Sequence, residues 1–150
     1  MGNVLKLLSG SEGETVAIGR KVGKYVKDRK IPVCLYGDLG AGKTTLIKGI
    51  GSAFGMSERD IGSASFLIVA EHDTVPPLYH IDLYRIEGGE ALHELGIWEY
   101  MEGEGVAVVE WAERLGERPS DAVAIFLQSA GSAEREIIIE GLDEKDWNNL

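Results

Sequence analysis

Apolar residues follow two different patterns along this chain, and the order of these patterns predicts a succession of strands and helices. Short apolar runs predict strands, whereas apolar residues spaced three or four positions apart among charged ones predict helices. The predicted strands are residues 3–8, 31–36, 67–71, 78–83, 105–111, 121–128 and 134–140. The predicted helices are residues 15–29, 43–54, 88–95 and 97–101. Short polar loops join 67–71 to 78–83 and 121–128 to 134–140, so both pairs are predicted to form antiparallel hairpins.

A glycine-rich loop separates the strand at 31–36 from the helix that follows it. Residues 37–44 fit the pattern G-x-x-x-x-G-K-[ST], in the strand–loop–helix context that this motif requires. Glycines let the backbone turn so that its N–H groups approach an anion, and the helix N-terminus adds its positive dipole end. A glycine-rich turn that merely precedes a helix is the alternative interpretation. We predict a phosphate-binding loop, with nucleotide contacts from Asp38, Leu39, Gly40, Ala41, Gly42, Lys43, Thr44 and Thr45.

The apolar run at 105–109 ends in an acid, Glu110, followed by Trp111. This is the form of a Walker B strand, which delivers a carboxylate to Mg²⁺ or its waters. A strand-end acid in solvent is the alternative. With the phosphate-binding loop also present, we predict that the Thr44 hydroxyl and Glu110 handle Mg²⁺ and that Lys43 reaches the β- and γ-phosphates.

Two further stretches carry polar groups that a nucleotide site could use. In the strand at 78–83, alternation places His80 and Asp82 on one face, where we expect a hydrogen-bonded pair or an Asp that supports Mg²⁺ indirectly. No further ligands at suitable spacing favour a protein-only metal site here. Ser65 lies in a small, hydroxyl-bearing loop of the kind that senses the γ-phosphate in some P-loop proteins.

Composition limits the class of protein. At 150 residues and 44% hydrophobic, we expect a single domain over residues 1–150, with a polar tail at 142–150 that frays. The net charge of −10 repels phosphate backbones, so a nucleic-acid role is expected to act through a partner or a local basic patch. The one cysteine, Cys34, lies in a buried strand and fits a reducing compartment. No signal peptide or membrane-spanning run is evident, which predicts a soluble, cytoplasmic protein without membrane contact.

Motifs that the chain lacks reduce the number of candidate nucleotides and candidate reactions. The chain has no Asn-Lys-x-Asp sequence, which favours ATP over GTP. A small-molecule kinase using the same loop remains an alternative, although only Arg59 and Arg85 lie between the two Walker elements. A nucleotide-gated binding module without catalysis is a third possibility. The sequence does not decide whether Arg85, Arg114 or a partner's arginine meets the γ-phosphate.

Three motifs in the same order resemble those of the TsaE (YjeE) family of bacterial P-loop ATPases. They are Gly37-Asp38-Leu39-Gly40-Ala41-Gly42-Lys43-Thr44-Thr45, His80-Ile81-Asp82-Leu83-Tyr84-Arg85 and Val109-Glu110-Trp111-Ala112-Glu113-Arg114. The resemblance extends from about residue 11 to the last hairpin. One departure is that the family's Ser-Pro-Thr-Phe is Ser63-Ala64-Ser65-Phe66 here, which keeps a hydroxyl at Ser65 but loses the proline.

The resemblance implies an α/β, P-loop NTPase-like three-layer fold with a mixed, mainly parallel sheet and antiparallel hairpins. It implies ATP and Mg²⁺ as cofactors and weak Mg²⁺-dependent ATP hydrolysis. It also implies a role with the partners TsaD and TsaB in making threonylcarbamoyladenosine at position 37 of tRNA. Asp82, Glu110 and Ser65 are the catalytic residues that it implies, with Asp82 positioning the attacking water and Trp111 close to the nucleotide.

Overall fold

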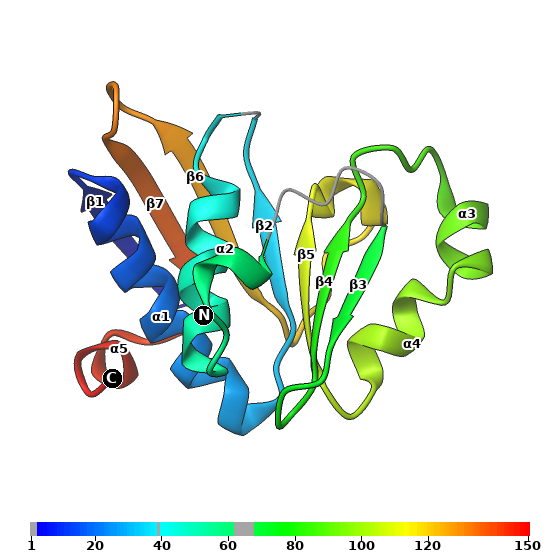
Figure 1. Cartoon of the computed structure of the whole chain (residues 1–150). Coiled ribbons are helices and arrows are strands. Elements are labelled where there is room, and N and C mark those ends of the chain that lie inside the picture. The colour runs from blue at the N-terminus through cyan, green and yellow to red at the C-terminus, as the bar shows by residue number, and fades with distance from the viewer. Residues whose placement is uncertain (1–2, 39, 62–67) are drawn as a thin grey trace.

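The computed structural model describes residues 3–38, 40–61 and 68–150, and its centre is one mixed β-sheet. Within these residues the strand order is β1-β7-β6-β2-β5-β4-β3 (Figure 1). The strands are β1 (Val4–Ser9), β2 (Val33–Tyr36), β3 (Val69–His72), β4 (Leu78–Asp82), β5 (Val106–Glu110), β6 (Val123–Ser129) and β7 (Arg135–Glu140). The helices are α1 (Glu12–Arg29), α2 (Lys43–Ala53), α3 (Gly89–Glu94), α4 (Ile97–Glu102) and α5 (Glu144–Asn148), with 3-10 turns η1 (Glu58–Asp60) and η2 (Ala112–Leu115).

The sheet combines a parallel centre with antiparallel edges. Strands β6, β2, β5 and β4 run parallel to one another. At one edge β3 pairs antiparallel with β4, and at the other β7 and β1 add antiparallel strands to β6. Both predicted hairpins are therefore present, and the predicted α/β fold class is confirmed.

Helices cover both faces of the sheet, which gives three layers (Figure 1). Helices α1 and α2 pack on one face, over a core that includes Val33, Leu35 and Val108. On the other face α3, α4 and η2 cover a second core around Cys34, Ile81 and Val109. Neighbouring residues of one strand supply the two cores because successive side chains point to opposite faces.

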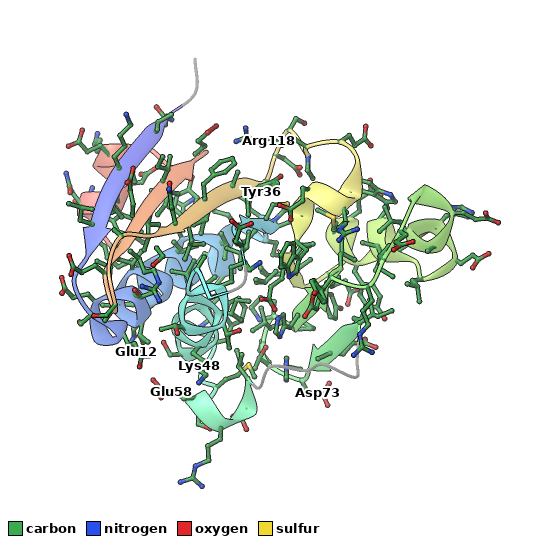
Figure 2. All side chains as sticks on the ribbon, turned by 90° about the horizontal axis from the view of Figure 1, so that it is seen from above. Glu12, Tyr36, Lys48, Glu58, Asp73 and Arg118 are labelled. Carbon is green, nitrogen blue, oxygen red and sulfur yellow. The ribbon has the colours of Figure 1, made fainter. Side chains whose placement is uncertain are left out.

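The second face also carries an aromatic stack beyond these helices. The rings of Tyr36 and Phe126, paired in β2 and β6, stack with centroids 4.7 Å apart. The Arg118 guanidinium lies 5.5 Å from the Phe126 ring centroid. Figure 2 shows Tyr36 and Arg118 across the sheet from Lys48 of α2.

Glycines allow α1 and α2 to approach so closely that their backbones touch. A Cβ on Gly19 would lie 2.2 Å from the Leu46 carbonyl oxygen, and one on Gly49 would lie 2.1 Å from that of Val16. No side chain fits at these separations. The close packing fixes α2, and with it the loop that precedes α2, against the rest of the domain.

The C-terminal residues differ from the fraying that we expected. Residues 144–148 form α5, and the Asp143 side chain caps the helix by accepting from the Asp146 N–H. Leu142 is fully buried and Trp147 is 8% exposed, both in the core beside α1. The segment is mostly polar, so the sequence did not indicate that Leu142 and Trp147 are buried. Their burial holds the segment in place.

Candidate functional site

The loop between β2 and α2 has the backbone form of an anion-binding turn. Gly40 and Gly42 have φ values of 79° and 100°, a region that favours glycine. A Cβ on Gly37 would lie 2.7 Å from the Leu127 carbonyl oxygen, so only glycine fits between the loop and β6. Helix α2 begins directly afterwards, at Lys43. The loop therefore leads into an 11-residue helix whose first N–H groups are available to an anion.

Lys43 is buried at the start of α2, with only 5% of its surface exposed. Its Nζ donates a hydrogen bond to the Gly37 carbonyl oxygen and lies 3.5 Å from the centroid of the Trp111 ring. Burial lowers the pKa of Lys43, while the negative charges of Glu110, Glu113 and Asp82 act in the opposite direction. An ammonium with one hydrogen-bond acceptor and an aromatic face can turn to a phosphate without breaking an ion pair.

Two carboxylates stand on neighbouring strands near Lys43. Asp82 ends β4 and Glu110 ends β5, and the two residues are direct partners in the parallel register. Burial raises the pKa of Asp82, against the hydrogen bond that the Tyr84 N–H donates to Asp82 Oδ1. The Glu110 charge raises this pKa further and the Lys43 charge lowers it, so the three groups share one electrostatic environment.

Glu110 is bonded to a histidine inside the protein. His80 Nε2 lies 2.7 Å from Glu110 Oε2, with side chains that are 4% and 9% exposed. Of our two expectations for His80 and Asp82, a hydrogen bond between them is wrong, because His80 bonds to Glu110 instead. Indirect support of Mg²⁺ by Asp82 stays a prediction. Alternation places both of them on one face of β4, but the parallel register brings Glu110 to the same face, within reach of His80.

Trp111 turns back toward Lys43 directly after β5. Its φ of 56° is left-handed, which is rare for a bulky residue. The Tyr84 ring lies against it, with centroids 5.1 Å apart. The turn folds the indole over the start of α2, where the sequence predicted a residue near the nucleotide.

Comparisons with known proteins show the family to which this chain belongs. A family model described as "Threonylcarbamoyl adenosine biosynthesis protein TsaE" matches residues 9–137. The chain is 41% identical over 135 residues to the tRNA threonylcarbamoyladenosine biosynthesis protein TsaE of Bacillus subtilis (strain 168), covering 89% of this chain and 83% of that protein. The chain belongs to the TsaE family.

Other relatives support the same membership. The protein of the same name from Treponema pallidum (strain Nichols) is 35% identical over 136 residues, which cover 90% of this chain and 99% of the relative. The crystal structure of YdiB from Bacillus subtilis superposes with a TM-score of 0.71 at 36% identity, covering 93% of this chain and 86% of that one. The similarity thus extends through all three TsaE motifs named above.

The structure brings together most of the residues predicted from these TsaE motifs. The loop residues 38 and 40–42 lead to Lys43, and Thr44 and Thr45 lie half-buried in the first turn of α2. Trp111 contacts Lys43, and Asp82 and Glu110 lie close enough for their charges to act on it. Leu39 and Ser65 lie outside the described residues, so their predicted roles stay predictions.

Arg135 is a residue of the site that the sequence motifs did not indicate. It begins β7, and its Nη2 donates to the Gly40 carbonyl oxygen at 3.2 Å. Its Nη1 donates to the carbonyl oxygens of Glu134 and Gly131, at 2.7 and 3.4 Å. A Cβ on Gly42 would lie 3.2 Å from Arg135 Nε. This arginine braces the loop between β2 and α2 from a hairpin far away in sequence, and no local pattern marks such a contact.

The polar groups at the site fit Mg²⁺ better as a partner of phosphate than as an ion held by protein alone. Among the described residues, no group of three or more His, Cys, Asp or Glu side chains is placed to hold a metal. Mg²⁺ commonly uses one or two protein oxygens together with phosphates and water. The Thr44 hydroxyl and the Glu110 carboxylate are oxygen donors of this kind.

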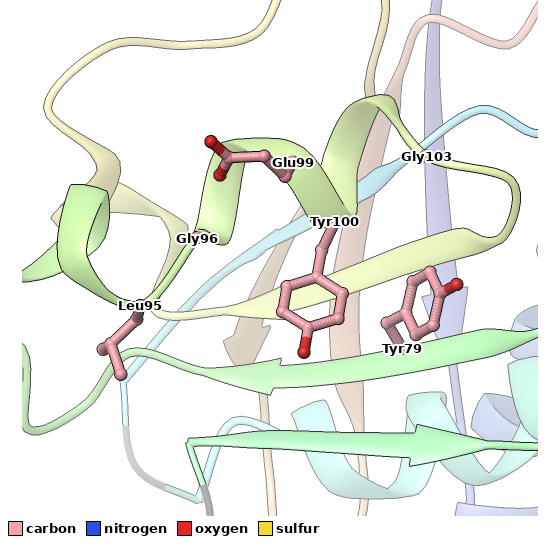
Figure 3. A pocket seen from close by; sticks show the side chains of 6 residues that line it. All are labelled: Tyr79, Leu95, Gly96, Glu99, Tyr100 and Gly103. Carbon is pink, nitrogen blue, oxygen red and sulfur yellow. The ribbon is translucent and has the colours of Figure 1, made fainter.

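A pocket elsewhere in the molecule is separate from this site. It has a volume of about 410 Å³ and lies between β4 and α4 (Figure 3). Its lining residues are Tyr79, Leu95, Gly96, Glu99, Tyr100 and Gly103. Tyr79 points to the opposite face of β4 from His80, so the sheet separates the pocket from the loop between β2 and α2.

Within the described chain, no helix is long and apolar enough to cross a membrane.

Proposed function

We propose that this chain binds ATP with Mg²⁺ at residues 37–45, hydrolyses it slowly, and supports threonylcarbamoyladenosine formation at position 37 of tRNA. The observation that carries the proposal is the position of Lys43. It is a buried ammonium at a helix N-terminus. The carboxylates of Asp82 and Glu110, at the ends of two adjacent strands, act on it through their charges. Membership of the TsaE family supplies the biosynthetic context.

The residues divide the work of phosphoryl transfer to water. The N–H groups of the loop and of the first turn of α2 hold the phosphates, and Lys43 leaves Gly37 and Trp111 to reach the β- and γ-phosphates. Thr44 and Glu110 would hold Mg²⁺, which would supply positive charge to the phosphate oxygens. Asp82 orients the attacking water, a role for which its position beside Glu110 is suited. Trp111 borders the nucleotide.

We propose further that ATP binding and hydrolysis switch the chain between two states on a complex of TsaD and TsaB. The net charge of −10 opposes direct binding to RNA, so tRNA is held by the partner complex. Partner binding is also expected to raise the low intrinsic rate. We propose that the chain acts in the cytoplasm.

The proposal is tested by measuring ATP hydrolysis by the purified chain, with and without TsaD and TsaB. We expect slow turnover alone and a marked increase with the pair. Lys43→Ala should abolish ATP binding because it removes the buried ammonium. Asp82→Ala and Glu110→Ala should still bind ATP, since neither removes a phosphate ligand, but they should lose turnover. Full hydrolysis by both carboxylate variants would contradict these roles, and an unchanged rate with the pair would contradict the partner assignment.

A further inference from the structure

One oxygen of the Glu110 carboxylate is already bonded within the protein. His80 Nε2 lies 2.7 Å from Glu110 Oε2, and both side chains are almost fully buried. We propose that His80 is the positioning residue for Glu110: its Nε2–H holds Oε2 and leaves Oε1 for Mg²⁺ or its waters. This inference rests on the proposed function, which gives Glu110 to the metal.

The sheet places the two side chains so that this bond can form without movement of the backbone. His80 pairs with Val108 in the parallel register, and Glu110 lies two residues beyond Val108 on the same strand face. Both residues belong to regular strands, β4 and β5. The hydrogen bond therefore fixes only the side-chain torsions of Glu110. A long carboxylate side chain has several rotamers, and one charge-assisted bond selects among them.

Without His80, the Lys43 ammonium would compete for Glu110. The Lys43 ammonium interacts electrostatically with Glu110. Among the described residues, however, Glu110 is hydrogen-bonded to His80 and forms no salt bridge with Lys43. A glutamate that turned to Lys43 would tie up both the metal ligand and the phosphate ligand in one ion pair. The His80 bond keeps the two functions apart.

The test uses variants that differ in whether a donor occupies the Nε2 position. In His80→Gln the side-chain amide nitrogen reaches about as far as Nε2, whereas in His80→Asn it is one methylene shorter. His80→Leu removes the donor but keeps an apolar side chain of similar bulk, and serves if the Asn variant does not fold. Thermal unfolding of each variant establishes that it is folded before binding is measured.

The measured quantity is the factor by which Mg²⁺ raises the affinity for a non-hydrolysable ATP analogue, obtained by calorimetry with and without the ion. Loss of a residue that orients a metal ligand typically weakens metal binding by about 10- to 100-fold. We therefore expect His80→Asn or His80→Leu to reduce the Mg²⁺ factor by about tenfold or more. His80→Gln should restore most of it, and affinity without Mg²⁺ should stay close to that of the parent chain.

A double-mutant cycle with Glu110→Gln shows whether His80 acts through Glu110. In the Glu110→Gln background, His80→Asn should cause no further loss of the Mg²⁺ factor. A folded His80→Asn or His80→Leu variant with an unchanged Mg²⁺ factor overturns the inference, and so do equal losses in the Gln and Asn variants. If Glu110→Gln alone leaves the Mg²⁺ factor unchanged, the metal role of Glu110 in the proposed function fails instead.

Discussion

The ammonium of Lys43 lies against the Trp111 ring, 3.5 Å from its centroid. A cation this close to an aromatic face is attracted by the π electrons, and burial strengthens the contact. The lysine that is proposed to bind phosphate is therefore held by an aromatic ring and by the Gly37 carbonyl oxygen. Its transfer to a nucleotide would change the surroundings of the indole.

This contact predicts an optical change on nucleotide binding. When ATP draws Lys43 away from the ring, Trp111 fluorescence should change in intensity or wavelength. Trp111→Phe should abolish most of the change, although Trp98 and Trp147 remain. Titration of both proteins with ATP and Mg²⁺ checks this. An equal change in the Phe variant would show that Trp111 does not report on the nucleotide.

Arg135 lies outside the sequence motifs, but its contact with the loop predicts that replacing it lowers the affinity for nucleotide. Arg135→Gln removes the hydrogen bond to the Gly40 carbonyl oxygen and loosens the loop. A hydrogen bond of this kind contributes about 1 kcal/mol, so we expect ATP affinity to fall by about threefold to tenfold in calorimetry. Arg118→Gln is the matched control, because Arg118 pairs with Glu140 at an exposed site. Equal affinities of the two variants would refute a bracing role for Arg135.

The burial of the Asp82 carboxyl predicts that removing its charge stabilises the chain but abolishes ATP turnover. Its pKa is raised in the folded chain, chiefly by burial. A carboxyl with a raised folded pKa favours folding below its unfolded pKa of about 3.9 and opposes folding as the pH rises through the folded value. Asp82→Asn should therefore raise Tm at pH 7, and this gain should disappear toward pH 4. The same variant should lose ATP turnover. A lower Tm at pH 7 in the variant would contradict the account of Asp82.

The contact between α1 and α2 predicts a large effect of one methyl group. Gly49→Ala would place a Cβ 2.1 Å from the Val16 carbonyl oxygen, so the helices must separate. Overpacking of this kind typically costs about 1–3 kcal/mol, and backbone contact favours the upper end. Gly13→Ala is the control on an exposed turn of α1, where a Cβ meets only Ser11 Oγ at 3.8 Å. It should stabilise the chain by up to about 1 kcal/mol, since alanine favours helix more than glycine does.

Urea denaturation measures both free energies of unfolding. A Gly49→Ala variant as stable as Gly13→Ala would show that the two helices are not in backbone contact. Because α2 carries Lys43 at its start, displacement of the helix should also weaken ATP binding.

Local sequence patterns predicted most of the elements and the loop, because those depend on nearby residues. The strand–loop–helix unit around Lys43 and the acid at the end of β5 are local features. The bond from His80 to Glu110 and the contact from Arg135 to Gly40 join residues 30 and 95 positions apart. They depend on strand order and register, which no local pattern contains. The helix at 144–148 was missed because Leu142 and Trp147 act through tertiary burial within a polar segment.

We propose above that this chain uses ATP to support threonylcarbamoyladenosine formation. The most direct measurement is the amount of this nucleoside in tRNA, by mass spectrometry, from bacteria whose own TsaE has been depleted and replaced by this chain. We expect that the chain restores the modification and that an equally expressed Lys43→Ala variant does not. Restoration by both proteins, or by neither when both are folded, would contradict it.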